Sequence, residues 1–328
     1  MKLRILSLSI IGLCSLGVQA DDLSQFTEIS QKANFIDGVN VVEPPEFTND
    51  PTFSDSIADR ANAMGAIAVD RDGNQYTADI SEDALRAFEA AVKTFDELGL
   101  DATLFSTPEK DATIKPKVTG EEEEIQGVVI GSDDRTRITN TTSSPYKYIG
   151  HISVGCTGTL IGDKYVLTAG HCVADGRGNW YQKLDFAAGQ NGSAKPWGTT
   201  KWKNAVTTTA WFNNRNSNYD YALIVLEKAP HGGSAAWGVY SGGTHSVTGY
   251  PGDKTRWTLW TDSGKTNTIS SYRICYTLDT AGGQSGSGIR DSSNYVRGIH
   301  TTGSSSRNCG TRLTSTVYSE LKRWISSY

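Results

Sequence analysis

Histidine and cysteine are scarce in this sequence, and clusters of basic residues are absent. The 328 residues include 5 histidines and 5 cysteines. No two histidines have the spacing of metal ligands, so a metal enzyme is not expected, and we expect neither a metal nor another cofactor. No long run of Lys and Arg occurs, which argues against a nucleic-acid partner.

The N-terminus carries an apolar run that is too short to cross a membrane. The run extends from Ile5 to Val18, whereas a transmembrane helix needs about 20 apolar residues. Lys2 and Arg4 precede the run, and Val18-Gln19-Ala20 ends it with the small residues of a cleavage site. We therefore expect residues 1–20 to be a cleaved signal peptide and the protein to be secreted, without a membrane partner.

The remaining sequence divides into two regions of opposite charge. Residues 21–127 contain 24 acidic and 8 basic residues, whereas residues 128–328 contain 12 acidic and 21 basic residues. The first region has no histidine and no cysteine, so it has few groups for catalysis. We expect residues 21–127 to be an acidic propeptide that docks on the basic region and assists its folding. The open alternative is an independent acidic binding domain.

One stretch of the expected propeptide has helical periodicity. It extends from Ser81 to Leu100, and Ser81-Glu82-Asp83 is typical of a helix N-terminus. The propeptide should therefore be small and partly helical. The apolar residues at helical spacing are Ala84, Leu85, Phe88, Ala91, Val92 and Phe95.

From Val128 onward, short candidate strands are separated by Gly, Asn, Ser and Thr. This pattern predicts an all-β body, either a sandwich or a barrel. Apolar residues recur on one face of residues 315–327 and predict a terminal helix. The candidate strands are Tyr148–Ile152, Tyr165–Thr168, Tyr221–Leu226, His245–Gly249 and Tyr295–His300.

Three short segments supply the groups that acyl transfer by a hydroxyl requires. His171 follows a candidate strand, Asp220 precedes another, and Ser285 lies in the loop Gly282-Gly283-Gln284-Ser285-Gly286-Ser287-Gly288. We expect Ser285 to be the nucleophile, His171 the general base and then the acid, and Asp220 the group that orients His171. Each motif alone is more often structural, but together they fill every role of a catalytic triad.

The glycines of this loop predict a site for the oxyanion. Amides of Gly283 and Ser285 that point toward one atom require a tight turn, which glycine allows at positive φ without a steric cost. A catalytically silent binding protein is the competing class. Such a protein would be expected to have lost a triad residue or an oxyanion glycine, and none is missing.

In combination, these segments resemble the chymotrypsin-like serine peptidases, with the chain order His, Asp, Ser. The resemblance extends from Val128 to the C-terminal helix and leaves the propeptide unmatched. A finer resemblance is to the bacterial glutamyl endopeptidases of the bacillar and staphylococcal type. It rests on the segments Val129-Ile130-Gly131-Ser132-Asp133-Asp134-Arg135-Thr136-Arg137, Gly249-Tyr250-Pro251-Gly252-Asp253-Lys254 and Asp279-Thr280.

The resemblance implies a fold of two Greek-key, six-stranded β-barrels with a C-terminal helix. Barrel one would cover about 128–232, barrel two about 240–314 and the helix about 315–327, with the active site between the barrels. Export would remove Cys14 and leave an even number of cysteines, for which spacing alone selects no pairing. The family pattern implies the disulfide Cys156–Cys172, which leaves Cys275 and Cys309 to pair with each other.

Two features give opposite indications of the side chain after which the enzyme cuts. Asp279 stands six residues before Ser285, where trypsin-like enzymes keep the acid that binds Lys or Arg. His300, on a strand that lines the primary pocket in this fold, and the hydroxyl of Thr280 would instead bind a carboxylate. Glutamyl endopeptidases share both features, so we expect cleavage after Glu, and less well after Asp; cleavage after Lys or Arg is the alternative.

Activation should differ from that of trypsin. Gln284 stands where trypsin-like zymogens have the Asp that pairs with the new N-terminus, and it cannot form that ion pair. The resemblance places the mature start near Val128, where the freed amine would help to bind the substrate carboxylate. We expect a monomeric zymogen whose partners are protein and peptide substrates and its own propeptide, which would block the active site until removed.

Overall fold

The computed structural model describes residues 26–38, 56–97, 128–270, 272–304 and 306–328. The expected signal peptide (1–20) and the residues before Val128 (98–127) lie outside the described residues. Among the residues that are described, no helix is long and apolar enough to cross a membrane.

The first half of the expected peptidase region forms one antiparallel barrel. Its strands lie in the order β11-β12-β8-β7-β6-β10, and a bridge between Phe186 and Thr200 brings β10 beside the chain that leads into β11. The short strand β9 (Trp180–Tyr181) lies outside this order. The bounds are β6 (Ile149–Ile152), β7 (Cys156–Gly162), β8 (Tyr165–Thr168), β10 (Phe186–Ala188), β11 (Trp202–Thr208) and β12 (Ala222–Leu226).

The second half forms a closed six-stranded barrel. Its order is β13-β16-β17-β18-β15-β14, and β13 also pairs with β14. The strand β5 (Thr136–Ile138) adds to β14 and so joins the start of the region to this barrel. The expected pair of six-stranded barrels is confirmed. The bounds are β13 (Gly243–Gly249), β14 (Leu259–Thr268), β15 (Arg273–Tyr276), β16 (Gly288–Asp291), β17 (Val296–Gly303) and β18 (Asn308–Arg312).

Short helices and one long helix complete the peptidase region. The expected terminal helix is α5 (Ser315–Ser326), in which the Thr314 side chain caps the helix by accepting a hydrogen bond from the Val317 amide. Trp324 of α5 stacks on Tyr221, the residue directly before β12. The shorter helices are η3 (Tyr146–Tyr148), η4 (Gly170–Cys172), α4 (Thr209–Asn214) and η5 (Ser217–Tyr219).

Helix α5 also places a carboxyl group in the protein interior. Glu320 is 1% exposed and accepts a hydrogen bond from the Tyr221 hydroxyl. Burial raises the pKa of this carboxyl to about 7. A titratable group therefore contacts Tyr221, the residue that follows Asp220 in the sequence.

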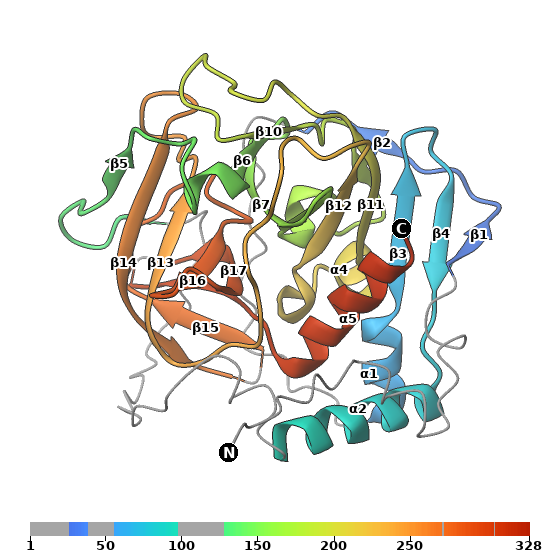
Figure 1. The fold of residues 1–328 in the computed structure, drawn as a ribbon. Coiled ribbons are helices and arrows are strands. Elements are labelled where there is room, and N and C mark those ends of the chain that lie inside the picture. The colour runs from blue at the N-terminus through green and yellow to red at the C-terminus, as the bar shows by residue number, and fades with distance from the viewer. Residues whose placement is uncertain (1–25, 39–55, 98–127, 271, 305) are drawn as a thin grey trace, which may run out of the picture.

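The acidic region adds strands as well as helices to the first barrel. Strand β3 (Ala66–Asp70) pairs antiparallel with β11, from Ala66 opposite Thr208 to Asp70 opposite Asn204. This pairing extends the barrel sheet to nine strands, since β4 (Gln75–Ala78) and β1 (Thr27–Ile29) follow β3. Sequence reasoning named none of these strands. Figure 1 shows β3 and β4 continuing the sheet beyond β11.

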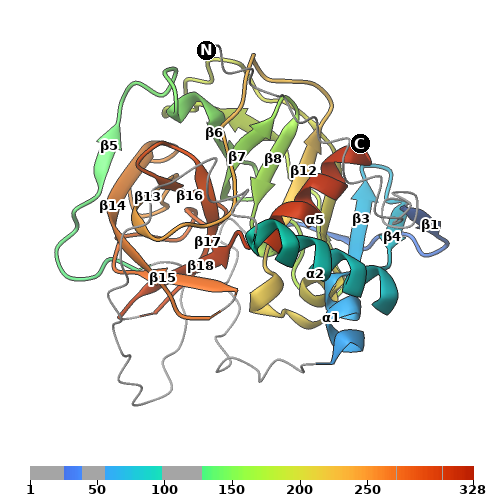
Figure 2. The same cartoon turned by 60° about the horizontal axis from the view of Figure 1, so that its bottom comes forward.

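Further contacts join the acidic region to the same side of the molecule. Strand β2 (Phe35–Ile36) pairs with β9, and the Trp180 indole donates a buried 2.8 Å hydrogen bond to Gln75 Oε1. Helix α1 (Ile57–Met64) packs on α4. The expected helix is α2 (Glu82–Glu97), which buries Leu85 and contacts α5, as Figure 2 shows.

Ion pairs contribute less to this interface than the charge of the two regions suggested. Asp37 pairs with Lys183 at 3.0 Å, but both side chains are more than half exposed. Arg71 reverses the expected polarity, because it is a base of the acidic region and lies 3.6 Å from Asp185. Exposed pairs are worth little, so strand pairing and apolar burial hold this interface together.

Candidate active site

His171 and Asp220 lie side by side because β8 and β12 are neighbours. Ala222 pairs with Thr168, and His171 follows Thr168 in η4. The His171 Nδ1 atom lies 2.7 Å from Asp220 Oδ2, and the His171 amide donates a 2.9 Å hydrogen bond to Asp220 Oδ1. Both side chains are buried, and His171 Nε2 has no hydrogen-bond partner among the described residues. This arrangement fixes the ring and leaves Nε2 able to accept a proton.

The loop that carries Ser285 packs against the segment that leads to His171. Gly286 has φ +84°, and a Cβ there would lie 2.1 Å from Thr168 Oγ1 and 3.2 Å from the Ala169 nitrogen. No larger residue fits this contact. The loop comes from the second barrel and His171 from the first, so the Ser285 loop and the segment before His171 meet where the barrels join.

The backbone of this loop leaves two amides unused. The Gly283 and Ser285 amides donate no hydrogen bond within the described part of the chain. The carbonyls around them are held: Gly252 N donates to Gly282 O at 2.6 Å, and Ser287 N donates to Gln284 O at 2.9 Å. Two free amides on a fixed loop are what an oxyanion site needs.

Two buried donors predicted to bind the substrate carboxylate also lack partners. Thr280 Oγ1 and His300 Nε2 are buried and have no hydrogen-bond partner among the described residues. His300 Nδ1 lies 2.7 Å from the Tyr276 hydroxyl. A phenol that donates to Nδ1 leaves the proton on Nε2, so His300 can donate from that side. Burial, followed by the effect of His171, lowers the pKa of His300 to about 3, so this donor is neutral at neutral pH.

Asp279 accepts hydrogen bonds from two backbone amides near the start of the expected peptidase region. Its Oδ1 accepts a 2.7 Å hydrogen bond from the Ile130 amide, and its Oδ2 accepts a 2.8 Å hydrogen bond from the Asp134 amide. The side chain is 2% exposed. Asp279 therefore holds the segment that follows Val128.

Val128 lies beside this group and is held by Asn308. The Val128 amide donates to Asn308 Oδ1 at 2.9 Å, and Asn308 Nδ2 donates to the Val128 carbonyl at 2.7 Å. The Thr280 amide also reaches this carbonyl, at 3.2 Å. Val128 thus contacts one of the two expected carboxylate-binding residues directly.

Gln284 has a partner that sequence reasoning did not identify. Its Oε1 accepts from the Ala281 amide at 3.0 Å and lies 3.5 Å from Arg135 Nη1. The Arg135 side chain is fully buried and pairs with Asp133 at 2.8 Å and Asp253 at 2.5 Å. A cation close to the start of the region thus approaches the residue before Ser285.

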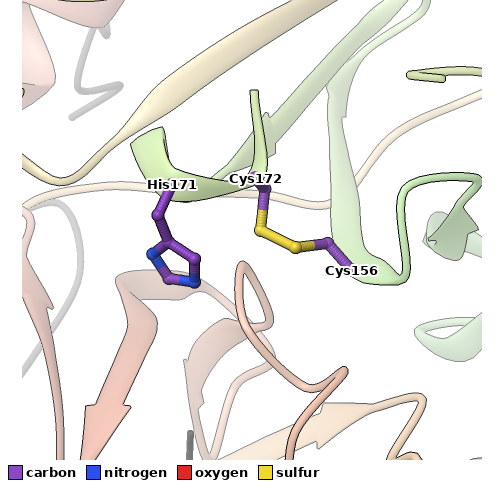
Figure 3. A group of neighbouring side chains, drawn as sticks. All are labelled: Cys156, His171 and Cys172. Carbon is purple, nitrogen blue, oxygen red and sulfur yellow. A yellow bond between two sulfur atoms is a disulfide. The ribbon is translucent and has the colours of Figure 1, made fainter. Parts of the chain in front are cut away.

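The four cysteines outside the expected signal form two disulfides, Cys156–Cys172 and Cys275–Cys309. The first lies beside His171, as Figure 3 shows. Cys156, His171 and Cys172 are close enough together to suggest a metal site, but the two sulfurs are bonded to each other and offer no thiolate. This cluster is therefore no metal centre.

Sequence reasoning missed three residues that support the site. Thr157, Asn308 and Tyr276 bond to the Ser285 loop, to Val128 and to His300, respectively. Only Thr157 had a signal in the sequence, since it follows a cysteine expected to pair beside His171. The others contact partners that are distant in the sequence, and no local pattern marks them.

The two barrels and the grouping of His171, Asp220 and the Ser285 loop define a serine peptidase of the chymotrypsin-like class. A model of the Trypsin family matches residues 134–325, which is more than half of the chain. The chain belongs to the trypsin family and is a serine endopeptidase.

Individual proteins of known name are also similar to this chain. The chain is 41% identical over 221 residues to a glutamyl endopeptidase of Bacillus licheniformis, which covers 61% of this chain and 69% of that protein. It is 37% identical over 219 residues to a protein of Bacillus subtilis named extracellular metalloprotease, covering 60% of this chain and 70% of the relative. A solved structure of a Glu endopeptidase in complex with MPD has 29% identity and a TM-score of 0.57, covering 61% of this chain and 99% of that one.

Proposed function

We propose that this chain is a secreted endopeptidase that cuts after Glu, and less well after Asp, through an acyl-enzyme. Ser285 attacks the carbonyl, His171 takes its proton and returns it to the leaving amine, and Asp220 keeps His171 oriented. The Gly283 and Ser285 amides hold the oxyanion. The hydrogen-bond partners described above support these roles.

The observation that carries the specificity is the difference between Asp279 and His300. The Asp279 carboxylate already accepts hydrogen bonds from two backbone amides, whereas His300 Nε2 and Thr280 Oγ1 are buried and have no partner within the described part of the chain. A buried donor without an acceptor costs free energy until a ligand supplies one. A substrate carboxylate is such an acceptor, and the glutamyl endopeptidase relatives favour the same choice.

Two measurements test the proposal. A fluorophosphonate should form a covalent adduct on Ser285 of the processed protein, and no adduct would favour a silent binding protein. A peptide library should then show cleavage after Glu. An adduct without a preference for Glu would support the serine peptidase assignment but contradict the proposed specificity.

We also propose that residues 1–20 are a signal peptide, residues 21–127 the propeptide and residues 128–328 a monomeric mature enzyme that needs no cofactor, nucleic acid or membrane. Strand β3 on β11 and α2 on α5 support docking of the propeptide. None of its described hydrogen bonds or ion pairs ends on His171, Asp220 or Ser285. Blocking of the active site therefore stays a prediction, while two disulfides favour an oxidising, extracellular compartment.

A further inference from the structure

Thr157 makes two hydrogen bonds to the loop of the nucleophile, and a third hydrogen bond orients its hydroxyl. It is fully buried in β7. Its amide donates to the Ser285 carbonyl at 2.9 Å, and its hydroxyl donates to the Gly283 carbonyl at 2.8 Å. The Tyr250 amide donates to the same hydroxyl at 3.0 Å.

The Tyr250 amide determines the direction of the Thr157 hydroxyl. An amide N–H can only donate, so the hydroxyl oxygen must accept from Tyr250 and its single proton must go to Gly283 O. The hydroxyl therefore cannot rotate away from Gly283 without leaving a buried donor and a buried acceptor unpaired. Such a loss is costly in the protein interior.

The backbone at Gly282-Gly283 needs contacts from outside the loop to hold its conformation, because neither residue has a side chain that could do so. Gly283 has φ +95°, and a glycine reaches other backbone conformations at little cost. Because the peptide unit is planar, a fixed Gly283 carbonyl also fixes the plane shared with Gln284. The planes on either side carry the free amides of Gly283 and Ser285.

The Thr157 amide holds another peptide plane of the loop, the one between Ser285 and Gly286. It binds the Ser285 carbonyl, while Gly286 N in that same peptide donates to the His300 carbonyl at 2.8 Å. Thr157 thus supports the planes on both sides of the Ser285 amide. It is also joined through the Cys156–Cys172 disulfide to the segment that carries His171.

We propose that Thr157 is a positioning residue of the reaction, whose hydroxyl keeps the Gly283 and Ser285 amides directed at the oxyanion. Its effect appears only when negative charge develops on the substrate oxygen, since the ground-state carbonyl depends less on these amides. The proposal rests on the proposed function, because it requires Ser285 to be the nucleophile.

The experiment compares Thr157→Val, which keeps the shape and removes the hydroxyl, with Thr157→Ser, which keeps the hydroxyl. Active sites are titrated with a fluorophosphonate, and kcat and KM are measured per titrated site. Thr157→Val should lose kcat by about 10- to 100-fold with KM within about 2-fold, and Thr157→Ser should recover most of the rate. The affinity for a peptide aldehyde, which forms a tetrahedral adduct, should fall in parallel with kcat.

The same strand provides a matched control. Thr159 is also fully buried, two residues along β7, and its hydroxyl has no hydrogen-bond partner among the described residues. Thr159→Val should leave kcat per active site unchanged. An equal loss in both valine variants would reduce the role of Thr157 to packing.

Further outcomes overturn the inference without touching the proposed function. If wild type is labelled on Ser285 and Thr157→Val keeps its kcat within about 2-fold, Thr157 does not position the loop. If neither Thr157→Val nor Thr157→Ala folds while Thr157→Ser does, the hydroxyl serves folding and the inference is wrong. If wild type itself is not labelled, the proposed function fails first.

Discussion

Separate alanine substitutions of His300 and Asp279 distinguish the two interpretations of the specificity pocket. His300 is buried, and its free Nε2 donor has no partner among the described residues, whereas Asp279 holds the amides of Ile130 and Asp134. We expect His300→Ala to impair cleavage after Glu. Asp279→Ala should leave the preference for Glu intact, because its carboxylate contacts the backbone of a neighbouring segment.

The size of the His300 effect follows from its protonation state. In the free enzyme the pKa of His300 is about 3, so the ring is neutral at neutral pH and meets the substrate carboxylate as a hydrogen-bond donor. A hydrogen bond to a charged group is worth about 1.5–3 kcal/mol. Because each 1.4 kcal/mol is tenfold, kcat/KM for Glu substrates should fall by about 10- to 150-fold.

Asp279→Ala should act mainly on stability. It leaves two backbone amides without their charged acceptor, at a cost of about 3 kcal/mol or more in the free energy of unfolding. The two variants thus differ in kind, since one changes kcat/KM for Glu and the other changes the unfolding midpoint in denaturant.

The assay measures kcat/KM on matched peptides that differ only in Glu, Asp, Lys or Arg before the scissile bond. Denaturant unfolding of both variants supplies the control for folding. A wild type that prefers Lys or Arg, with a preference that disappears in Asp279→Ala, would falsify the glutamyl assignment. The serine peptidase assignment would survive that result.

Three other predictions concern the triad, self-processing and the buried carboxyl of Glu320. Ser285→Ala and His171→Ala should each lower kcat by about 10⁴- to 10⁶-fold with folding nearly intact, and retained activity in pure Ser285→Ala protein would move the nucleophile elsewhere. Ser285→Ala precursor expressed alone should remain uncut, because Glu121–Glu124 lie just before Val128 and suit an enzyme that cuts after Glu; mass spectrometry showing normal maturation would exclude self-processing. Glu320 has a raised pKa of about 7, so its stabilising effect is complete below its unfolded pKa and is lost as the pH rises through 7. The melting temperature of Glu320→Gln, which is neutral throughout, should therefore fall less than that of wild type between about pH 5 and pH 8, and an unchanged difference in the melting temperature would contradict this.

The sequence predicted those parts of the site that depend on local patterns. His171 after a strand, Asp220 before one and Ser285 among glycines are each visible within a few residues, and so is the apolar face of α5. Glycine at 286 is explained by a contact only the fold reveals, since Thr168 fills the space that a Cβ would occupy.

Features that depend on distant partners could not be predicted. The position of Asp279 relative to Ser285 suggested a pocket acid, but its acceptor oxygens bind amides about 150 residues earlier in the chain. The Ala66–Asp70 strand has little local signal, because its stability comes from pairing with β11 across the interface between the two regions. Hydrogen-bond partners, rather than residue type, determine these roles.

The contacts after Val128 indicate what processing at this residue changes. Asp279 holds the amides of residues 130 and 134, and Asn308 binds both backbone groups of Val128, although the chain still continues upstream. These contacts use groups that exist before cleavage. Cleavage before Val128 would therefore add a charged amine beside Thr280, at a position where the surrounding contacts have already formed. Because Gln284 is bonded to the Ala281 amide, we expect the loop of Ser285 not to depend on an ion pair with a new N-terminus. Activation in this chain should consequently act on recognition of the substrate carboxylate more than on assembly of the oxyanion site.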